Sequence, residues 1–382
     1  MAAVGQSGPR PLPRRESQAL TMPPTLLQTL PGPYRFFRGG EIPEVTLAYE
    51  TWGTLSPAKD NALLLTTGLS PGSHARSNSL NPEPGWWEDM IGPGRPLDTN
   101  RWFVICNNSF GSCLGSTGAA STDPRTGRPY RLTFPCLSIE DVATTSRLLL
   151  KSLGIHPVAA VVGSSMGGMT ALAYGVMFPF EADRIMSISA GAHAEPFAIS
   201  MRSAQREAIR LDPDWLGGDY PKEKPPLNGM RLARKVGVVT YRSPVEWNER
   251  FGRKRIPRAP ADPWATRFEI ESYLDHQAEK FVGRFDANCY LYLSRAMDLF
   301  DLGDHGTSVV EALSKLRACR ARIIGVESDI LFPVEQQHTL AAALNEAGVE
   351  SSFVSLGSIH GHDSFLIDYE RFGPAVGDFL KD

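Results

Sequence analysis

Short apolar runs alternate with helical patterns along the first half of the chain. Four runs are rich in aliphatic or β-branched residues, as in strands buried on both faces: residues 61–67, 102–106, 158–162 and 184–189. Helical patterns lie at residues 138–153 and 166–177. This alternation, with short connections, predicts an α/β fold with a mostly parallel sheet and helices on both faces.

The alternation stops after residue 192 and returns near residue 316. Helical periodicity fills the interval, with helices expected at residues 199–211, 229–241, 268–285 and 287–302. A strand at 321–326, a helix at 334–347, a strand at 352–356 and a helix at 369–380 follow. We therefore expect core segments at 31–192 and 316–382, separated by a helical lid insertion at 193–315. Residues 1–30 are rich in Pro, Arg and Ser and are expected to form a disordered tail.

The third apolar run ends in Gly163-Ser164-Ser165-Met166-Gly167, where a helical pattern begins at once. A G-x-S-x-G sequence between a strand and a helix predicts a nucleophile elbow, in which the central serine occupies a sharp turn. Glycines flank Ser165 where a Cβ would clash as strand and helix close together. The pentapeptide alone also fits a Gly/Ser-rich connection without chemistry, so the assignment depends on partners elsewhere.

A nucleophilic serine needs a histidine base and an acid that orients this histidine. In α/β-hydrolases the acid and then the histidine follow the serine, each on a loop after a strand. Asp329 follows the strand expected at 321–326, and His362 follows the one at 352–356. We predict the triad Ser165, Asp329 and His362. The competing candidates are Ser164, which is not the central elbow residue, Glu327 and His360.

The turn also predicts hydrogen-bond donors for an oxyanion. The N–H of Met166, at the start of the helix, is expected to face the reacting oxygen. A second donor should come from the loop after an earlier strand, and we expect it to be the N–H of Leu69. This loop reads Gly68-Leu69-Ser70-Pro71.

Composition and charge exclude several classes of function. A net charge of −3 and a pI near 6.3 argue against a nucleic-acid surface or polybasic membrane docking. No run approaches the roughly 18 apolar residues that span a membrane. The five cysteines lack C-x-x-C spacing, so we expect no metal site, reduced thiols and a cytoplasmic location. The translation start is open between Met1 and Met22.

Several motifs in order make the chain similar to the homoserine O-acyltransferase family of α/β-hydrolase-fold enzymes. They cover the chain from about residue 34 to its end: LAYETWG (47–53), GSTG (115–118), SMGGM (165–169), LDPDW (211–215), GG (217–218), RLAR (231–234), TYR (240–242), SYL (272–274), FDANCY (285–290) and GHD (361–363). The resemblance implies the same triad, an α/β-hydrolase fold and a homodimer formed through the lid.

One departure from the family pattern indicates a branch. Homoserine acetyltransferases usually carry H-A-L-T-G at the oxyanion loop, whereas residues 67–71 read T-G-L-S-P. With GWWE at 85–88 and ESYL at 271–274, this version resembles the serine O-succinyltransferase branch. The resemblance implies succinyl transfer from succinyl-CoA to L-serine, on a route to cysteine, without a permanently bound cofactor. The alternatives are homoserine O-acetyl- or O-succinyltransferase activity, or a same-fold esterase.

The resemblance also implies substrate contacts. Arg234 matches a lid arginine that binds the amino-acid substrate, where a guanidinium suits a carboxylate. Asp363 matches the acid beside the triad histidine, which suits an α-ammonium, and the loop 68–71 lines the acceptor site. A succinyl group ends in a carboxylate that an acetyl group lacks, so its site needs a cation. We expect this cation to be Arg202, with Arg206 as the second candidate.

Overall fold

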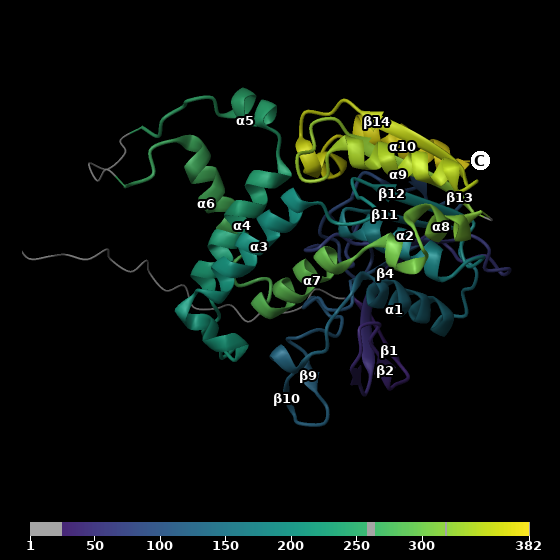
Figure 1. Ribbon diagram of the computed structural model, residues 1–382, viewed down its shortest axis with the longest axis horizontal. Helices are drawn as coiled ribbons and strands as arrows, with labels where there is room; N and C mark the ends of the chain where they lie inside the picture. Colours follow the sequence, from purple (N-terminus) through teal and green to yellow (C-terminus); the bar gives the residue numbers. More distant parts are fainter. Residues whose placement is uncertain (1–24, 258–263, 318, 382) are drawn as a thin grey trace, which may run out of the picture.

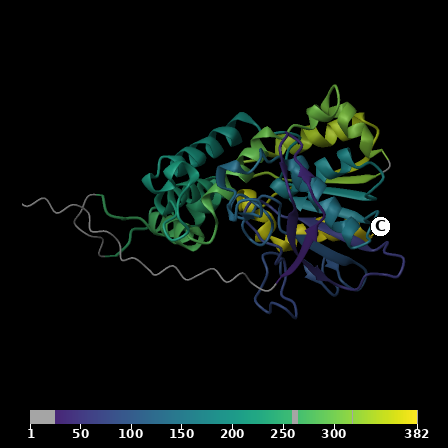
Figure 2. The same cartoon turned by 90° about the horizontal axis from the view of Figure 1, so that it is seen from below.

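A computed structural model describes residues 25–257, 264–317 and 319–381 of the chain (Figure 1). Most of the predicted tail, including Met22, lies outside these residues. A layered α/β region lies beside a helical region built largely from α3, α4 and α6 (Figures 1 and 2). Among the described residues, no helix combines the length and the apolar character needed to cross a membrane.

An eight-stranded sheet runs through the α/β region in the order β1-β4-β8-β5-β11-β12-β13-β14. Its strands are β1 (Leu26–Leu30), β4 (Val45–Trp52), β5 (Ala62–Thr66), β8 (Phe103–Asn107), β11 (Ala160–Ser164), β12 (Arg184–Ile188), β13 (Arg320–Val326) and β14 (Glu350–Leu356). The strands from β8 to β14 in this order pair in parallel, whereas β1 and β4 pair antiparallel. The mostly parallel sheet predicted from the apolar runs is therefore confirmed.

The edge strand β1 corrects the predicted tail. Leu26–Leu30 pair antiparallel with β4, in a register that puts Leu30 opposite Val45. The side chain of Leu30 is buried. The compositional argument for disorder rested on Pro and Arg residues further upstream, while this Leu-rich segment satisfies its backbone groups on the open edge of β4. The prediction of disorder was wrong for these five residues.

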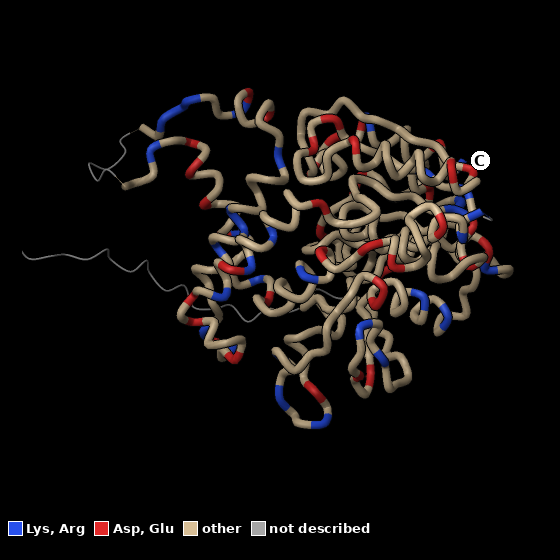
Figure 3. Tube along the Cα trace, viewed as in Figure 1, with Lys and Arg blue, Asp and Glu red and all other residues tan. Residues whose placement is uncertain are grey.

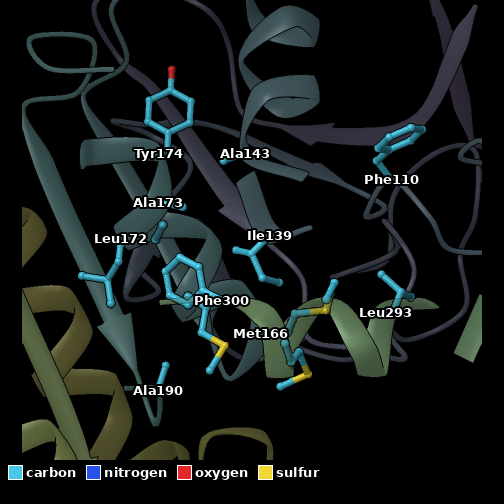
Figure 4. Close-up of a cluster of buried hydrophobic side chains, with 14 of the residues drawn as sticks. Phe110, Ile139, Ala143, Met166, Leu172, Ala173, Tyr174, Ala190, Leu293 and Phe300 are labelled. Atoms are coloured by element: carbon cyan, nitrogen blue, oxygen red, sulfur yellow. The ribbon is translucent and has the colours of Figure 1, made fainter. Parts of the chain in front are cut away.

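Helices cover both faces of the sheet, as predicted. α1 (Ile139–Ser152), α2 (Met166–Met177) and α9 (Val334–Glu346) contribute to the buried cluster on one face, part of which Figure 4 shows. α10 (Tyr369–Lys381) contributes to the cluster on the other face. Neighbouring strand residues alternate between them, since Val161 belongs to the first cluster and Val162 to the second. The continuous apolar runs are thus strands buried on both faces.

The described residues between β12 and β13 contain several helices. They are α3 (Pro196–Arg210), α4 (Leu227–Tyr241), α5 (Pro244–Arg250), α6 (Glu269–Phe281), α7 (Ala287–Leu299) and α8 (Val309–Leu313). α4 packs against α3 and α6, whereas α8 packs against α9 of the core. The last part of the insertion therefore lies with the α/β region.

Short elements complete the described chain. The two-residue strands are β2 (Tyr34–Arg35), β3 (Glu41–Ile42), β6 (Ile91–Gly92), β7 (Leu97–Asp98), β9 (Thr122–Asp123) and β10 (Arg128–Pro129). The 3₁₀ helices are η1 (Arg131–Thr133), η2 (Pro213–Gly218), η3 (Leu302–His305), η4 (Ser314–Leu316) and η5 (Gly361–Leu366). Of these, η5 matters most for the site because it carries His362.

Candidate active site

Ser165 alone forms the turn between β11 and α2. β11 ends at Ser164 and α2 begins at Met166. The backbone of Ser165 has φ 56° and ψ −123°, in a region that residues with a side chain rarely adopt. Its N–H donates to the carbonyl oxygen of Ile188 on β12 at 2.8 Å, which holds the strained residue at the carboxyl edge of the sheet.

Two glycines make this turn sterically possible. A Cβ at Gly163 would lie 2.1 Å from the carbonyl oxygen of Gly167. A Cβ at Gly167 would lie 2.2 Å from the carbonyl oxygen of Thr66 on β5. The Thr66 hydroxyl also donates to the Gly167 carbonyl at 2.8 Å, so β5, β11 and α2 meet here without room for another atom. The glycines of the pentapeptide are therefore required by close backbone approach.

The structure brings the three predicted triad side chains into one hydrogen-bonded chain. His362 Nε2 lies 2.8 Å from Ser165 Oγ, and His362 Nδ1 lies 2.7 Å from Asp329 Oδ2. The other oxygen of Asp329 accepts the N–H groups of Leu331 and Phe332, both at 2.9 Å. The carboxylate is thus fixed on both oxygens. It orients the histidine with Nδ1–H toward the acid and Nε2 toward the serine hydroxyl.

Burial and charge act in opposite directions on His362. Burial disfavours the charged ring, but the negative charge of Asp329 and its hydrogen bond outweigh burial and raise the pKa of His362 above its ordinary value of 6.5. The ring also stacks on Phe332, with centroids 5.3 Å apart. A histidine with this environment can accept a proton from Ser165 and hold it as a stabilised imidazolium.

The competing candidates lie elsewhere. Ser164 is the last residue of β11 and does not contact His362 through a hydrogen bond. Glu327 accepts a hydrogen bond from Ser355, and His360 faces Glu246 at 3.5 Å. Within the described residues, only Ser165, Asp329 and His362 form a continuous nucleophile–base–acid arrangement.

A cavity lies between this sheet edge and the lid. Its lining includes the loop 68–71, Ser165 and His362 on the core side, and Arg202, Gln205, Arg234 and Tyr241 on the lid side. Leu69 lines this cavity, and Met166 is the first residue of α2. In the part of the chain that the structure describes, neither backbone N–H has a protein acceptor. Both are therefore available to an oxyanion beside Ser165.

Arg202 contacts the buried carboxylate of Asp298 on α7. Its Nε donates to Asp298 Oδ1 at 2.5 Å, and its side chain is only 5% exposed. Nη1 and Nη2 are buried without a hydrogen-bond partner among the described residues. Unpaired buried guanidinium donors are costly unless a ligand accepts them. Arg202 is among the residues that line the cavity, and its charge acts on His362, so a cation lies close to the triad.

The second candidate, Arg206, lies outside this cavity. Arg206 Nη2 pairs with Asp298 Oδ2 at 2.6 Å, and its Nη1 donates to Ser294 Oγ at 2.9 Å. It lines a separate cavity with Trp215 and Arg210. Arg206 therefore pairs with the other oxygen of Asp298, and Arg202 alone of these two arginines lines the cavity that holds Ser165.

Arg234 and Asp363 both line the cavity. The guanidinium of Arg234 lies over the rings of Phe281 and Tyr241, at 4.7 Å and 5.6 Å from their centroids. Its Nε is buried without a partner among the described residues. Asp363 Oδ2 lies 3.3 Å from Arg242 Nε. A cation and an anion thus face one space, as an amino acid with its opposite charges requires.

Sequence reasoning missed several residues of this site. Asp298 and Gln205 belong to no motif, and their roles arise from packing between α3 and α7. Trp86 and Tyr241 lie in family motifs but carried no assigned role.

Within the described ranges, no group of three or more His, Cys, Asp or Glu side chains is placed to hold a metal ion.

Comparison with known proteins shows a family and several relatives for the chain. A family described as alpha/beta hydrolase fold matches residues 62–362. A serine O-succinyltransferase of Litchfieldella anticariensis is 56% identical over 354 residues, which cover 92% of this chain and 96% of the relative. Further relatives of the same name are 50–53% identical.

Solved structures share the whole architecture. A homoserine O-acetyltransferase from Bacillus anthracis is 29% identical with a TM-score of 0.87, and covers 94% of this chain and 98% of its own. Esterase E22 is also 29% identical with a TM-score of 0.85, and covers 94% of this chain and 99% of its own. Architecture alone therefore does not separate acyl transfer to an amino acid from ester hydrolysis.

Proposed function

The chain belongs to the serine O-succinyltransferases of the alpha/beta hydrolase fold, and from this membership we propose that it transfers a succinyl group to the hydroxyl of L-serine. The product is O-succinyl-L-serine, on a route to cysteine, and the donor is succinyl-CoA. One observation supports the proposal most strongly. The cavity that holds Ser165 has two separate arginines with unpaired donors, Arg202 and Arg234, which match the two carboxylates of the succinyl group and of serine.

The first half of the reaction acylates Ser165. Ser165 Oγ attacks the thioester carbonyl while His362 Nε2 takes its proton. The N–H groups of Leu69 and Met166 stabilise the tetrahedral oxyanion, each with about 2.7–4 kcal/mol. The C–S bond then breaks, His362 protonates the departing CoA sulfur, and a succinyl ester remains on Ser165. Asp329 holds the imidazole in the required tautomer throughout.

The second half delivers the acyl group to serine. Arg234 binds the carboxylate of L-serine and Asp363 binds its ammonium, so that the hydroxyl faces the ester. His362 removes the hydroxyl proton, the serine oxygen attacks the ester carbonyl, and Ser165 Oγ leaves with the proton returned by His362. The lid limits water, which would otherwise hydrolyse the acyl-enzyme. Ping-pong kinetics are expected.

The donor is selected by charge. Arg202 presents Nη1 and Nη2 to the terminal carboxylate of the succinyl group, in a cavity that an acetyl group would leave without an anion. Such an anion also satisfies donors that are otherwise unpaired. The loop Gly68-Leu69-Ser70-Pro71 shapes the acceptor side and favours serine over homoserine.

The assembly proposed is a cytoplasmic homodimer formed through the lid. Leu227, Leu232 and Val239 of α4 are 42%, 53% and 46% exposed, which supports an apolar contact surface on this helix. Nucleic acid and membranes are not expected as partners, given the net charge of −3.

A two-by-two assay tests the proposed function. Serine or homoserine is combined with succinyl-CoA or acetyl-CoA, and the products are identified by mass spectrometry. We expect the serine and succinyl-CoA pair to have the highest kcat/KM. Preference for homoserine with either donor would assign the chain to a homoserine O-acyltransferase. Equal CoA release with and without an amino acid would indicate an esterase.

A further inference from the structure

We propose that Arg242 is a positioning residue for the amino-acid acceptor, which holds the carboxylate of Asp363 in place for the substrate ammonium. The inference rests on the proposed function, because Asp363 binds the ammonium there. Arg242 follows α4 directly and precedes Ser243, the residue that caps α5. It does not line the cavity itself, so its effect on the substrate passes through Asp363.

Arg242 connects two carboxylates from different parts of the chain. Its Nε lies 3.3 Å from Asp363 Oδ2, in the loop after β14. Its Nη1 donates to Glu246 on α5, at 3.0 Å to one oxygen and 3.3 Å to the other. The side chain of Arg242 is 15% exposed. Glu246 therefore fixes the guanidinium, and the guanidinium leaves Asp363 Oδ1 free of any protein hydrogen bond among the described residues.

The backbone around Arg242 is locked to the loop that carries His362. A Cβ at Gly361 would lie 2.8 Å from both the carbonyl carbon of Arg242 and the nitrogen of Ser243. The Ser243 hydroxyl donates to the carbonyl oxygen of Ile359. α4 also contacts η5, where the end of the lid helix meets the loop after β14 (Figure 1). The lid and the histidine loop thus meet at Arg242 without an intervening side chain.

Burial and neighbouring charges act on the pKa of Asp363 in opposite directions. Burial raises the pKa of Asp363, while the charges of Arg242, His362 and Arg234 oppose the increase and that of Asp329 adds to it. Among the described residues, Arg242 is the cation that forms an ion pair with this carboxylate. A protonated Asp363 could not pair with an ammonium, so loss of Arg242 would weaken serine binding most strongly at low pH.

The test separates the two half-reactions of R242Q. Steady-state rates are measured with serine varied at saturating succinyl-CoA, and with succinyl-CoA varied at saturating serine. We expect kcat/KM for serine to fall about 10- to 100-fold, mainly through KM, as one charged contact is lost. The acid limb of its pH profile should move to higher pH. Acylation of Ser165 by succinyl-CoA alone should stay within about 3-fold, because it does not use Asp363. R242K should retain the wild-type acid limb.

R250Q is the matched control. Arg250 approaches the same Glu246 at 4.0 Å but has no ion pair with Asp363, so its kinetics should stay unchanged. An unchanged serine kcat/KM and acid limb in R242Q would overturn the inference, and so would an equal loss in both half-reactions. A wild-type chain that is acylated by another acyl-CoA and delivers it to serine would correct the donor and leave the inference intact. A wild-type chain that forms no acyl-enzyme would overturn both.

Discussion

The two walls of the cavity differ in how far their polar groups are satisfied. On the core wall, Ser165, His362 and Asp329 form a closed hydrogen-bonded chain. On the lid wall, Arg202 and Arg234 hold buried donors without partners among the described residues. Figure 3 shows Lys and Arg positions along the lid helices that contribute this wall. The three triad side chains are hydrogen-bonded to one another, whereas the lid wall carries guanidinium nitrogens without an acceptor among the described residues.

This difference indicates that the triad performs the acyl transfer and that other residues of the cavity select the substrates. Strand ends and tight backbone contacts fix the triad, so the same geometry can serve esterases and acyltransferases alike. We propose that the charge of Arg202 on the lid selects the acyl group, while Arg234 acts with Asp363 and the loop 68–71 of the core on the acceptor. Substitutions in the triad should therefore stop all acyl transfer, while those of the lid arginines should change substrate preference.

The largest effect is expected for S165A. Removal of the nucleophile should lower kcat by about 10⁴-fold or more for every donor, because no acyl-enzyme can form. Steady-state CoA release measures the loss. The matched control S164A changes the neighbouring hydroxyl, and it should keep kcat within about 10-fold. If S165A kept the acyl transfer and S164A lost it, the assignment of Ser165 as the nucleophile would be wrong.

D329N should lower kcat by about 10³–10⁴-fold, because the amide favours the wrong histidine tautomer. Asp329 raises the pKa of His362 against the effect of burial, so its loss should lower that pKa. His362 would then be neutral down to lower pH, and the acid limb of acylation should move to lower pH. Rapid-quench measurement of CoA release across pH checks both results. E327Q changes the alternative candidate for the acid, and it should leave the acid limb of acylation at its wild-type pH.

R202Q should change the preference between acyl donors without stopping acyl transfer, in contrast to the triad variants. The ratio of kcat/KM for succinyl-CoA to that for acetyl-CoA should fall about 10- to 100-fold, as expected for a lost charged hydrogen-bond pair. Acylation by acetyl-CoA should change little. An unchanged ratio would remove Arg202 from donor selection. Thermal unfolding should be recorded in parallel, because Asp298 then keeps only Arg206.

The smallest effect is expected for R206Q. Arg206 pairs with the same Asp298 as Arg202 but lines the other cavity. The donor ratio should change by less than about 3-fold, while the melting temperature falls modestly through the weakened buried pair. A shift in donor ratio as large as that of R202Q would show that the pair acts as one unit.

Periodicity and spacing predicted most of the fold and the core wall. The apolar runs became β5, β8, β11 and β12, and α2 spans the predicted Met166–Met177. The elbow could be predicted from the sequence because close packing requires glycine at fixed positions, as at Gly163. Asp329 and His362 could be predicted because the order of the strands determines which loops reach Ser165.

The lid wall was less predictable because its interactions join distant segments. Arg202 and Asp298 are 96 residues apart, and only the packing of α3 against α7 brings them together. Arg242 lay within a recognised motif, but its link to Asp363 depends on the meeting of α4 with η5. The edge strand β1 was missed for a similar reason, since β4 supplies its backbone partners.

We propose that Ser165 carries the succinyl group between donor and acceptor. Intact-mass spectrometry and peptide mapping of the chain, quenched after exposure to succinyl-CoA without an amino acid, test this role directly. We expect the mass of one succinyl group on the peptide that holds Ser165, and its rapid loss to O-succinyl-L-serine when serine is added. An unmodified chain that still forms product with serine would contradict the account, because transfer would then be direct.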